Sequence, residues 1–254
     1  MKLLKAMAIA FSIYSKIPVP QFEWKEEDME YMMCFFPWIG GVIGLFFFGW
    51  AVLCEKFAVG NVCYALIGAA IPLMISGGFH VDGYMDTMDA FHSYQSREKK
   101  LEILKDSHIG AFAAIMLALY YMIDIAAISE IHTQKAVSAL AAVFFLARCF
   151  SGIAVMTLQP AKKEGLLYTF ASSAQKVRVK AALYFQTVLC VVLMMLVSGW
   201  YGAAAIGAAL LSFFYFKKKS YKELGGITGD TAGFFVTVCE AAAAAAVAVA
   251  GYFL

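Results

Sequence analysis

Long apolar runs alternate with short polar segments along most of the chain. A transmembrane helix needs about 20 predominantly apolar residues to cross a hydrocarbon core of roughly 30 Å. Seven runs approach or reach that length, so the pattern predicts an all-α, polytopic integral membrane helix bundle with about seven transmembrane helices. They are expected near residues 35–54, 59–79, 109–129, 136–158, 177–197, 200–216 and 231–253.

A shorter apolar segment, residues 3–17, precedes the seven runs and ends at Pro18 and Pro20. No small-residue cleavage site follows it, so we do not interpret it as a signal peptide that is removed. We expect a short N-terminal helix that lies in the membrane interface, re-enters or crosses. The chain has no low-complexity linker and no clear internal repeat, which predicts a single domain over residues 1–254.

The composition agrees with a membrane protein. Hydrophobic residues make up 62% of the chain and charged residues 15%, with a mean hydropathy of +0.74, which excludes an ordinary soluble domain. The six cysteines are scattered through apolar segments without a C-x-x-C pair, so neither a zinc site nor a disulfide framework is indicated.

Basic residues gather on one side of the seven-helix arrangement. Of the 20 Lys and Arg, 17 lie in the N-terminal arm and in the loops after the second, fourth and sixth apolar runs. The other side has only Lys56 and Lys135, and Arg148 lies inside a run. Since basic loops stay in the cytoplasm, we expect the polar loops to face the cytoplasm, in the cytoplasmic (inner) membrane of a bacterium or archaeon.

The longest polar segment, residues 77–107, has three regularly spaced aspartates. Asp82, Asp86 and Asp89 follow an i, i+4, i+7 spacing, which on a helix places their carboxylates within about 60° of one another. Mg²⁺ prefers carboxylate oxygens and completes its shell with water and phosphate oxygens. The segment therefore predicts a Mg²⁺ site and chemistry on a pyrophosphate. The alternative is a solvated helical turn whose acids favour the helix N-terminus.

Three further residues near the aspartates are candidates for the site. His80 lies two residues before Asp82 and has the chemistry to transfer a proton or to orient a carboxylate, although a loop histidine is more often structural. Lys105 and Asp106 end the same polar segment. The basic residues before them, Arg97 to Lys100, have the alternative role of fixing membrane topology.

A second polar stretch, KELGGITGDTAG (222–233), precedes the last apolar run and contains Asp230. An aspartate just before a helix is a good N-cap. It is equally compatible with a fourth metal ligand, because the neighbouring glycines let the backbone bend around an anion. The spacing leaves both interpretations open.

Two opposite charges lie inside apolar runs. Arg148 and Glu240 are ten and nine residues from the cytoplasmic ends of their runs, about 14 to 15 Å deep at 1.5 Å per residue. Charges inside a membrane are usually paired or line a cavity. The matching depth predicts a structural Arg148–Glu240 ion pair, whereas Asp124 lies deeper and has no evident partner.

Several motifs follow one another in a characteristic order. They are FSIYSKIPVP, FFPWIGGVIG, GGFHVDGYMDTMDAF, LEILKDSHIGAFA, AKKEGLLYTF and KELGGITGDTAGFF. Together they resemble the cobalamin synthase family, the adenosylcobinamide-GDP ribazoletransferases of vitamin B12 assembly, over most of the chain. Ala90 and His108 depart from the Gly and Arg that are frequent in that family, which argues against an essential side chain at position 108.

The resemblance implies an enzyme with Mg²⁺ as cofactor. In the implied reaction a ribose hydroxyl of α-ribazole, or of its 5′-phosphate, attacks the corrinoid-linked phosphate of adenosylcobinamide-GDP, and GMP leaves. The metal is assigned to Asp82, Asp86 and Asp89, with Asp230 as a weaker ligand. Lys105 and Asp106 would position phosphate or nucleophile, and His80 would accept the proton. The expected partners are these two substrates and the lipid bilayer. Other late corrinoid-pathway enzymes are further candidate partners, and nucleic acid is not expected to bind.

Two other classes compete with this assignment. A CDP-alcohol phosphotransferase also has spaced aspartates after an Asp-Gly start, but it would have Ala-Arg where this chain has Asp86-Thr87, and it leaves GGITGDT unexplained. A cation or corrinoid transporter would place its ligands near the bilayer midplane on broken helices, whereas these acids are expected in cytoplasmic loops.

Overall fold

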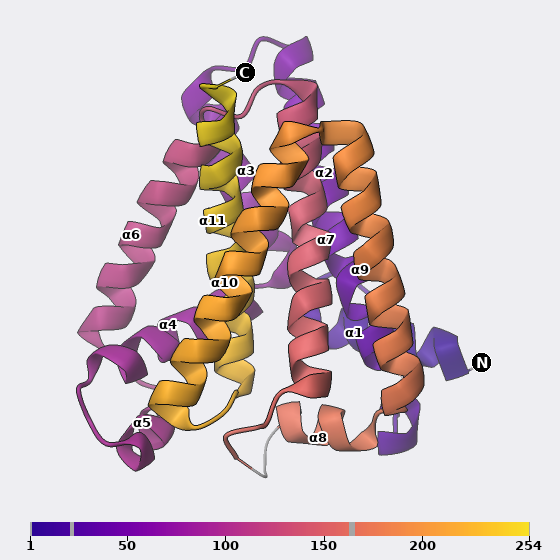
Figure 1. Cartoon of the computed structure of the whole chain (residues 1–254), viewed down its shortest axis with the longest axis vertical. Helices are drawn as coiled ribbons and strands as arrows, with labels where there is room; N and C mark the ends of the chain where they lie inside the picture. Colours follow the sequence, from indigo (N-terminus) through magenta and orange to yellow (C-terminus); the bar gives the residue numbers. More distant parts are fainter. Residues whose placement is uncertain (1, 21–22, 163–165, 254) are drawn as a thin grey trace.

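The computed structural model describes residues 2–20, 23–162 and 166–253, and this part of the chain is helical, without a strand. The long helices stand side by side in a bundle, in which α10 crosses the neighbouring α11 obliquely (Figure 1). The elements are α1 (Lys2–Tyr14), η1 (Glu26–Met29), η2 (Met32–Cys34), α2 (Phe36–Lys56), α3 (Asn61–Ser76), α4 (Phe79–His92), α5 (Arg97–Ile103), α6 (Ala111–Ile128), α7 (Gln134–Thr157), α8 (Leu166–Ser173), α9 (Lys176–Ser198), α10 (Trp200–Leu224) and α11 (Gly229–Gly251).

The all-α, multi-pass architecture is confirmed, and most of the seven expected spans correspond to helices long and apolar enough to cross a membrane. Among the described residues, α2, α6, α7, α9 and α11 are long and apolar enough to cross a membrane, and α3 with α4 adds a sixth only if this bent pair counts as one span. The predicted run 200–216 lies within α10, whose last two turns are rich in lysine. Helix α1 has 13 residues, fewer than the roughly 20 needed to cross.

The break between α3 and α4 shapes the functional end of the molecule. The two helices differ in direction by 97°. Gly77 and Gly78 make this turn with φ of +67° and +85°, a left-handed conformation that glycine adopts without the steric cost of a Cβ. The second predicted span therefore ends at Ser76, and α4 turns across the end of the bundle instead of continuing through it (Figure 1).

Helix α4 packs closely against α11 because glycines stand at their contact. A Cβ on Gly83 would lie 2.8 Å from the backbone oxygen of Asp230, and a Cβ on Gly233 would lie 3.1 Å from that of His80. The two backbones approach where side chains are absent. This contact brings the acidic stretch of α4 next to the first turn of α11.

The predicted intramembrane ion pair is confirmed. Arg148 Nη1 on α7 lies 2.7 Å from Glu240 Oε1 on α11, and both side chains are buried. The same Arg148 nitrogen donates to the carbonyl oxygen of Phe144 at 2.7 Å. The pair joins two helices in the interior of the bundle.

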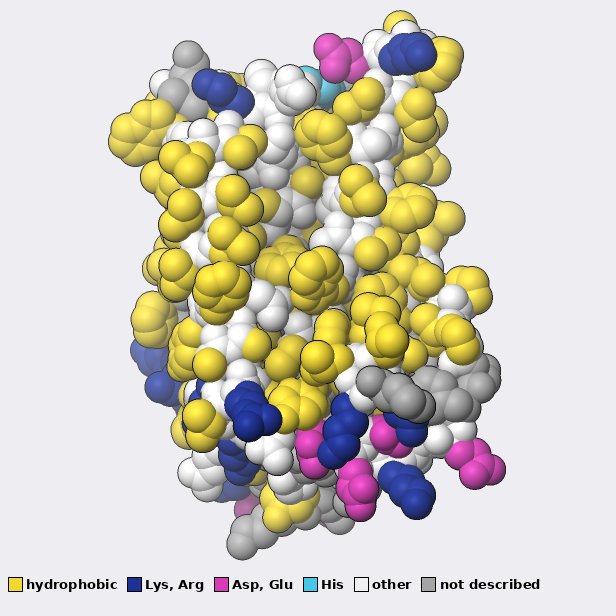
Figure 2. Space-filling model, turned by 90° about the vertical axis from the view of Figure 1, so that its right-hand side faces the viewer, with side chains coloured by type: hydrophobic (Ala, Val, Ile, Leu, Met, Phe, Trp, Pro, Cys, Tyr) yellow, Lys and Arg dark blue, Asp and Glu magenta, His cyan; other side chains and the backbone are white. Residues whose placement is uncertain are grey.

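Charged side chains are distributed unevenly over the molecule. Figure 2 shows hydrophobic side chains over most of one side of the bundle and a concentration of Lys, Arg, Asp and Glu toward its lower end. In Figure 1 this is the end that holds α4, α5, α8 and the start of α11. We call it the polar end.

Candidate active site at the polar end of the bundle

A cavity of about 540 Å³ opens at the polar end, where α4 crosses α11. Its wall combines charged and hydroxyl side chains with apolar ones such as Phe36 and Leu167. The polar side chains come from segments far apart in sequence. They are Tyr14, His80, Asp82, Lys105, Ser151, Lys162, Thr228 and Asp230.

The aspartates of α4 and α11 form a cluster of like charges. Burial, followed by the charges of Asp82, Asp230 and Asp89, raises the pKa of Asp86 to about 7. Of the four, Asp82 and Asp230 line the cavity. A nearby divalent cation would relieve the repulsion between them, so the donor chemistry fits Mg²⁺.

The acids do not form a closed metal cage by themselves. Within the described part of the chain, no three His, Cys, Asp or Glu side chains are grouped closely enough to hold an ion.

Asp89 is engaged with another helix. Its carboxylate accepts hydrogen bonds from the backbone N–H groups of Gly110, at 2.7 Å, and Ala113, at 2.8 Å. These donors belong to the start of α6, where a carboxylate satisfies free N–H groups and complements the helix dipole. Asp89 therefore caps α6 from a distance of 21 residues along the chain, and its part in metal binding stays a prediction.

Asp230 is not the N-cap of the last helix, because Thr228 has that role. The Thr228 hydroxyl accepts from the backbone N–H of Thr231 at 3.1 Å, and the Thr231 hydroxyl accepts from the N–H of Thr228 at 2.8 Å. Asp230 lies in the first turn instead, where the helix dipole favours a negative charge. Its carboxylate contributes to the cavity wall.

His80 is buried in an aromatic surrounding at the cavity wall. The rings of Phe36 and Phe79 lie 5.7 Å away, and that of Tyr14 stacks at 6.1 Å. Neither ring nitrogen has a hydrogen-bond partner among the described residues. Burial, with a smaller effect of the Arg148 charge, lowers the pKa of His80 well below its usual range. Burial thus favours the neutral imidazole and opposes its protonation.

Lys105 and Asp106, adjacent in sequence, have different surroundings. Lys105 lines the cavity, whereas the exposed Asp106 lies outside its wall and contacts His108. The Asp106 carboxylate accepts from the backbone N–H of His108 at 3.0 Å and lies 2.6 Å from the ring Nδ1, and these bonds lower the pKa of Asp106.

Lys162 is a cavity residue that the sequence pattern did not single out. Its Nζ donates to the carbonyl oxygen of Leu101 at 2.8 Å, and its charge acts on Asp230. The sequence feature that could have identified Lys162 is its position in the AKKEGLLYTF motif. Residues 163–165 of this motif lie outside the described residues. Cavity residues Ser151 and Thr228 were also not singled out.

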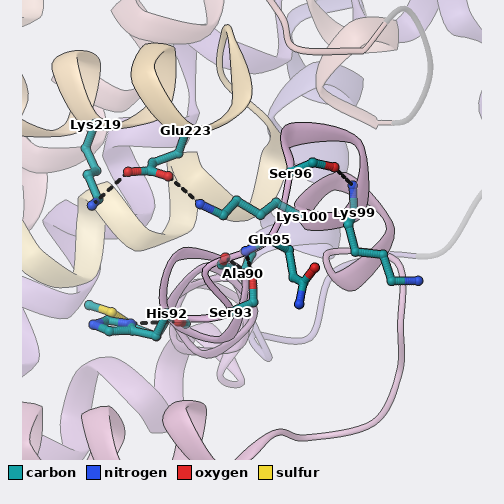
Figure 3. A network of polar contacts seen from close by, with 10 residues as sticks. Ala90, His92, Ser93, Gln95, Ser96, Lys99, Lys100, Lys219 and Glu223 are labelled. Carbon is teal, nitrogen blue, oxygen red and sulfur yellow. Dashed lines mark hydrogen bonds and ion pairs between the residues drawn. The ribbon is translucent and has the colours of Figure 1, made fainter.

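An ion-pair network fixes the short helix that precedes Lys105. Glu223 near the end of α10 accepts from Lys100 of α5 at 2.5 Å and pairs with Lys219 at 3.0 Å (Figure 3). Lys100 is buried. It therefore joins α5 to α10 and helps to position the segment that carries Lys105 to the cavity.

The fold and the cavity define a multi-pass membrane protein with a cavity at its polar end that is lined by both acidic and basic side chains. A family model described as cobalamin-5-phosphate synthase matches residues 6–248, and the chain belongs to this family. The chain is therefore assigned neither to the CDP-alcohol phosphotransferases nor to a transporter family.

Curated relatives agree over nearly the whole length. The chain is 44% identical over 250 residues to the adenosylcobinamide-GDP ribazoletransferase of Lachnoclostridium phytofermentans, covering 98% of this chain and 95% of the relative. It is 31% identical over 242 residues to the protein of the same name from Clostridium botulinum, covering 94% of each chain. The protein of that name from Azorhizobium caulinodans is 29% identical over 250 residues, covering 95% of this chain and 94% of the relative. No solved structure matches.

Proposed function

We propose that this chain is an adenosylcobinamide-GDP ribazoletransferase. It would join the phosphocobinamide part of adenosylcobinamide-GDP to α-ribazole, or to α-ribazole 5′-phosphate, and release GMP. Family membership and the names of the relatives support the substrates. The observation that carries the reaction type is a cavity that combines two aspartates, two lysines and a histidine without a hydrogen-bond partner among the described residues.

The proposed chemistry is a phosphoryl transfer. A ribose hydroxyl of the acceptor attacks the corrinoid-linked phosphorus, so that a new P–O bond forms while the P–O bond to GMP breaks. The hydroxyl proton passes to a base, for which neutral His80 is the candidate. Lys105 and Lys162 would stabilise negative charge on the phosphate oxygens, because positioning and charge stabilisation supply most of the catalysis in such transfers.

Asp82 and Asp230 are the proposed first ligands of Mg²⁺, with Asp86 and Asp89 beside them. Bound Mg²⁺ would neutralise charge on the pyrophosphate oxygens. The close backbone contact of α4 with α11 at Gly83 holds the segments that carry these carboxylates next to each other. Asp106, exposed and bonded to His108, would act only by positioning a neighbouring group.

We further infer that the polar end faces the cytoplasm of the bacterial or archaeal cell. Most Lys and Arg residues belong to segments expected at this end, and basic loops are retained in the cytoplasm. The sides of the bundle, covered by hydrophobic residues, would contact the lipid bilayer.

GMP release tests the proposal directly. Protein in lipid nanodiscs is supplied with adenosylcobinamide-GDP, α-ribazole and Mg²⁺, and GMP is measured by chromatography. We expect turnover that chelation by EDTA abolishes and Mg²⁺ restores. Asp82→Asn should lower kcat at least 100-fold, since it removes a charge that acts in the transition state. Glu55→Gln, at an exposed carboxylate of α2, is the matched control. A wild-type protein that releases no GMP would overturn the assignment.

A further inference from the structure

A second cavity, of about 530 Å³, lies on the opposite face of α4. On a helix, successive residues are rotated by about 100°. His80 and Gly83 line the first cavity, and Val81 and Met85 line the second, so the two cavities flank α4. Asp82 belongs to the wall of both. Any group bound in the second cavity is therefore adjacent to a proposed metal ligand of the first.

A lysine is held at this second cavity by the backbone. The N–H of Lys16 donates to the carbonyl oxygen of Ile75 at 2.8 Å, which ties the segment after α1 to the end of α3. The Lys16 stem lies against Gly77, where a Cβ would be only 2.4 Å from Lys16 Cε. Within the described residues Lys16 forms no ion pair. The Lys16 side chain is exposed, so its ammonium group can contact a phosphate bound in the cavity.

The remaining wall is partly hydroxyl-bearing and partly apolar. Ser76 is buried and brings a hydroxyl to the cavity wall. Phe79, Leu117 and Tyr121 supply aromatic and aliphatic surface. The volume falls within the roughly 300–1,000 Å³ of small-molecule sites. One lysine, a buried serine and an apolar wall match a nucleoside with at most one phosphate.

The first cavity has a different charge pattern. It carries Lys105 and Lys162 together with the aspartates, a combination that suits a metal-bound diphosphate. The charges of the first cavity therefore suit a ligand with two phosphate groups, and the single lysine of the second cavity suits a ligand with one.

We propose that the second cavity binds the acceptor of the transfer, a nucleoside or nucleoside 5′-monophosphate, with Lys16 at the phosphate and the ribose toward Asp82. This inference rests on the proposed function. It adds that donor and acceptor occupy separate sites on the two faces of α4. The acceptor's ribose hydroxyl reaches the donor phosphorus at the edge of α4 that bears Asp82, where the bond exchange described above takes place.

Steady-state kinetics of Lys16→Gln test the phosphate contact. Losing one hydrogen bond to a charged group costs roughly 1.5–3 kcal/mol, so the KM for α-ribazole 5′-phosphate should rise about tenfold or more. The KM for unphosphorylated α-ribazole and that for adenosylcobinamide-GDP should stay within about twofold. Lys135→Gln, which removes an exposed lysine outside the cavity, is the matched control. Unchanged KM for the phosphorylated acceptor would contradict the assignment.

Filling the cavity gives an independent test. Ser76→Leu should raise the KM for both acceptors at least tenfold, while the donor KM, which also reports on folding, stays within about twofold. Equilibrium dialysis of α-ribazole 5′-phosphate should show that GDP does not compete with it. Competition by GDP, or a rise of donor and acceptor KM together, would overturn separate sites. If wild-type protein binds α-ribazole 5′-phosphate but releases no GMP, the proposed function fails instead.

Discussion

The contact between α4 and α11 makes Gly83→Ala a sharp test of the site. An added Cβ would lie 2.8 Å from the Asp230 backbone oxygen and 2.9 Å from its Cα, whereas 3.4 Å is an ordinary contact. The two helices must therefore separate by about 0.6 Å. The obstacle is backbone, so no side-chain rotation relieves it. Overpacking of this kind costs about 1–3 kcal/mol of stability.

The same displacement moves Asp82 and Asp230 apart. Misplacing a reacting geometry by about 1 Å can lower a rate by about 10²-fold, so we expect Gly83→Ala to lower kcat for GMP release by about 10- to 100-fold. The assay is GMP release at saturating Mg²⁺ and substrates, beside thermal unfolding in nanodiscs. Gly233→Ala, with its 3.1 Å contact, should have a smaller effect.

Gly49→Ala in α2 provides the matched control, since no atom lies within 4 Å of its added Cβ. It should leave activity unchanged and increase stability slightly, because alanine favours helix over glycine by about 0.5–1 kcal/mol. Wild-type activity in Gly83→Ala would refute the view that this close approach sets the distance between the two aspartates.

Two further predictions concern side chains that join two helices. Glu240→Gln leaves the charge of Arg148 unpaired and should destabilise the fold by about 3–5 kcal/mol, measured as a lower unfolding temperature. The double substitution Arg148→Met with Glu240→Leu should recover most of this loss. Equal stability of Glu240→Gln and wild type would contradict the ion pair. Asp89→Asn keeps only one acceptor oxygen for the start of α6 and should cost about 0.5–2 kcal/mol, with faster amide hydrogen exchange at Gly110 and Ala113. An accompanying rise in the Mg²⁺ concentration required for half activity would indicate that Asp89 also binds metal, and unchanged exchange would contradict the cap.

The sequence alone determined the features that depend on local spacing and on hydropathy. Apolar runs indicated an all-α membrane bundle, and the i, i+4, i+7 spacing placed the three aspartates on helix α4. Matching depth in two apolar runs was sufficient to pair Arg148 with Glu240. These results follow from helix geometry, which is the same in any fold.

The tertiary structure decided which of these side chains meet. The 97° break after α3 and the Gly83 contact bring Asp82 to Asp230 across 148 positions of the chain. Asp89, on the same helix, is instead held by the start of α6. The spacing of residues along one helix fixes their relative direction, but it does not specify which neighbouring helix each side chain contacts. That choice depends on close approaches between segments distant in sequence, where the absence of a Cβ lets two backbones meet.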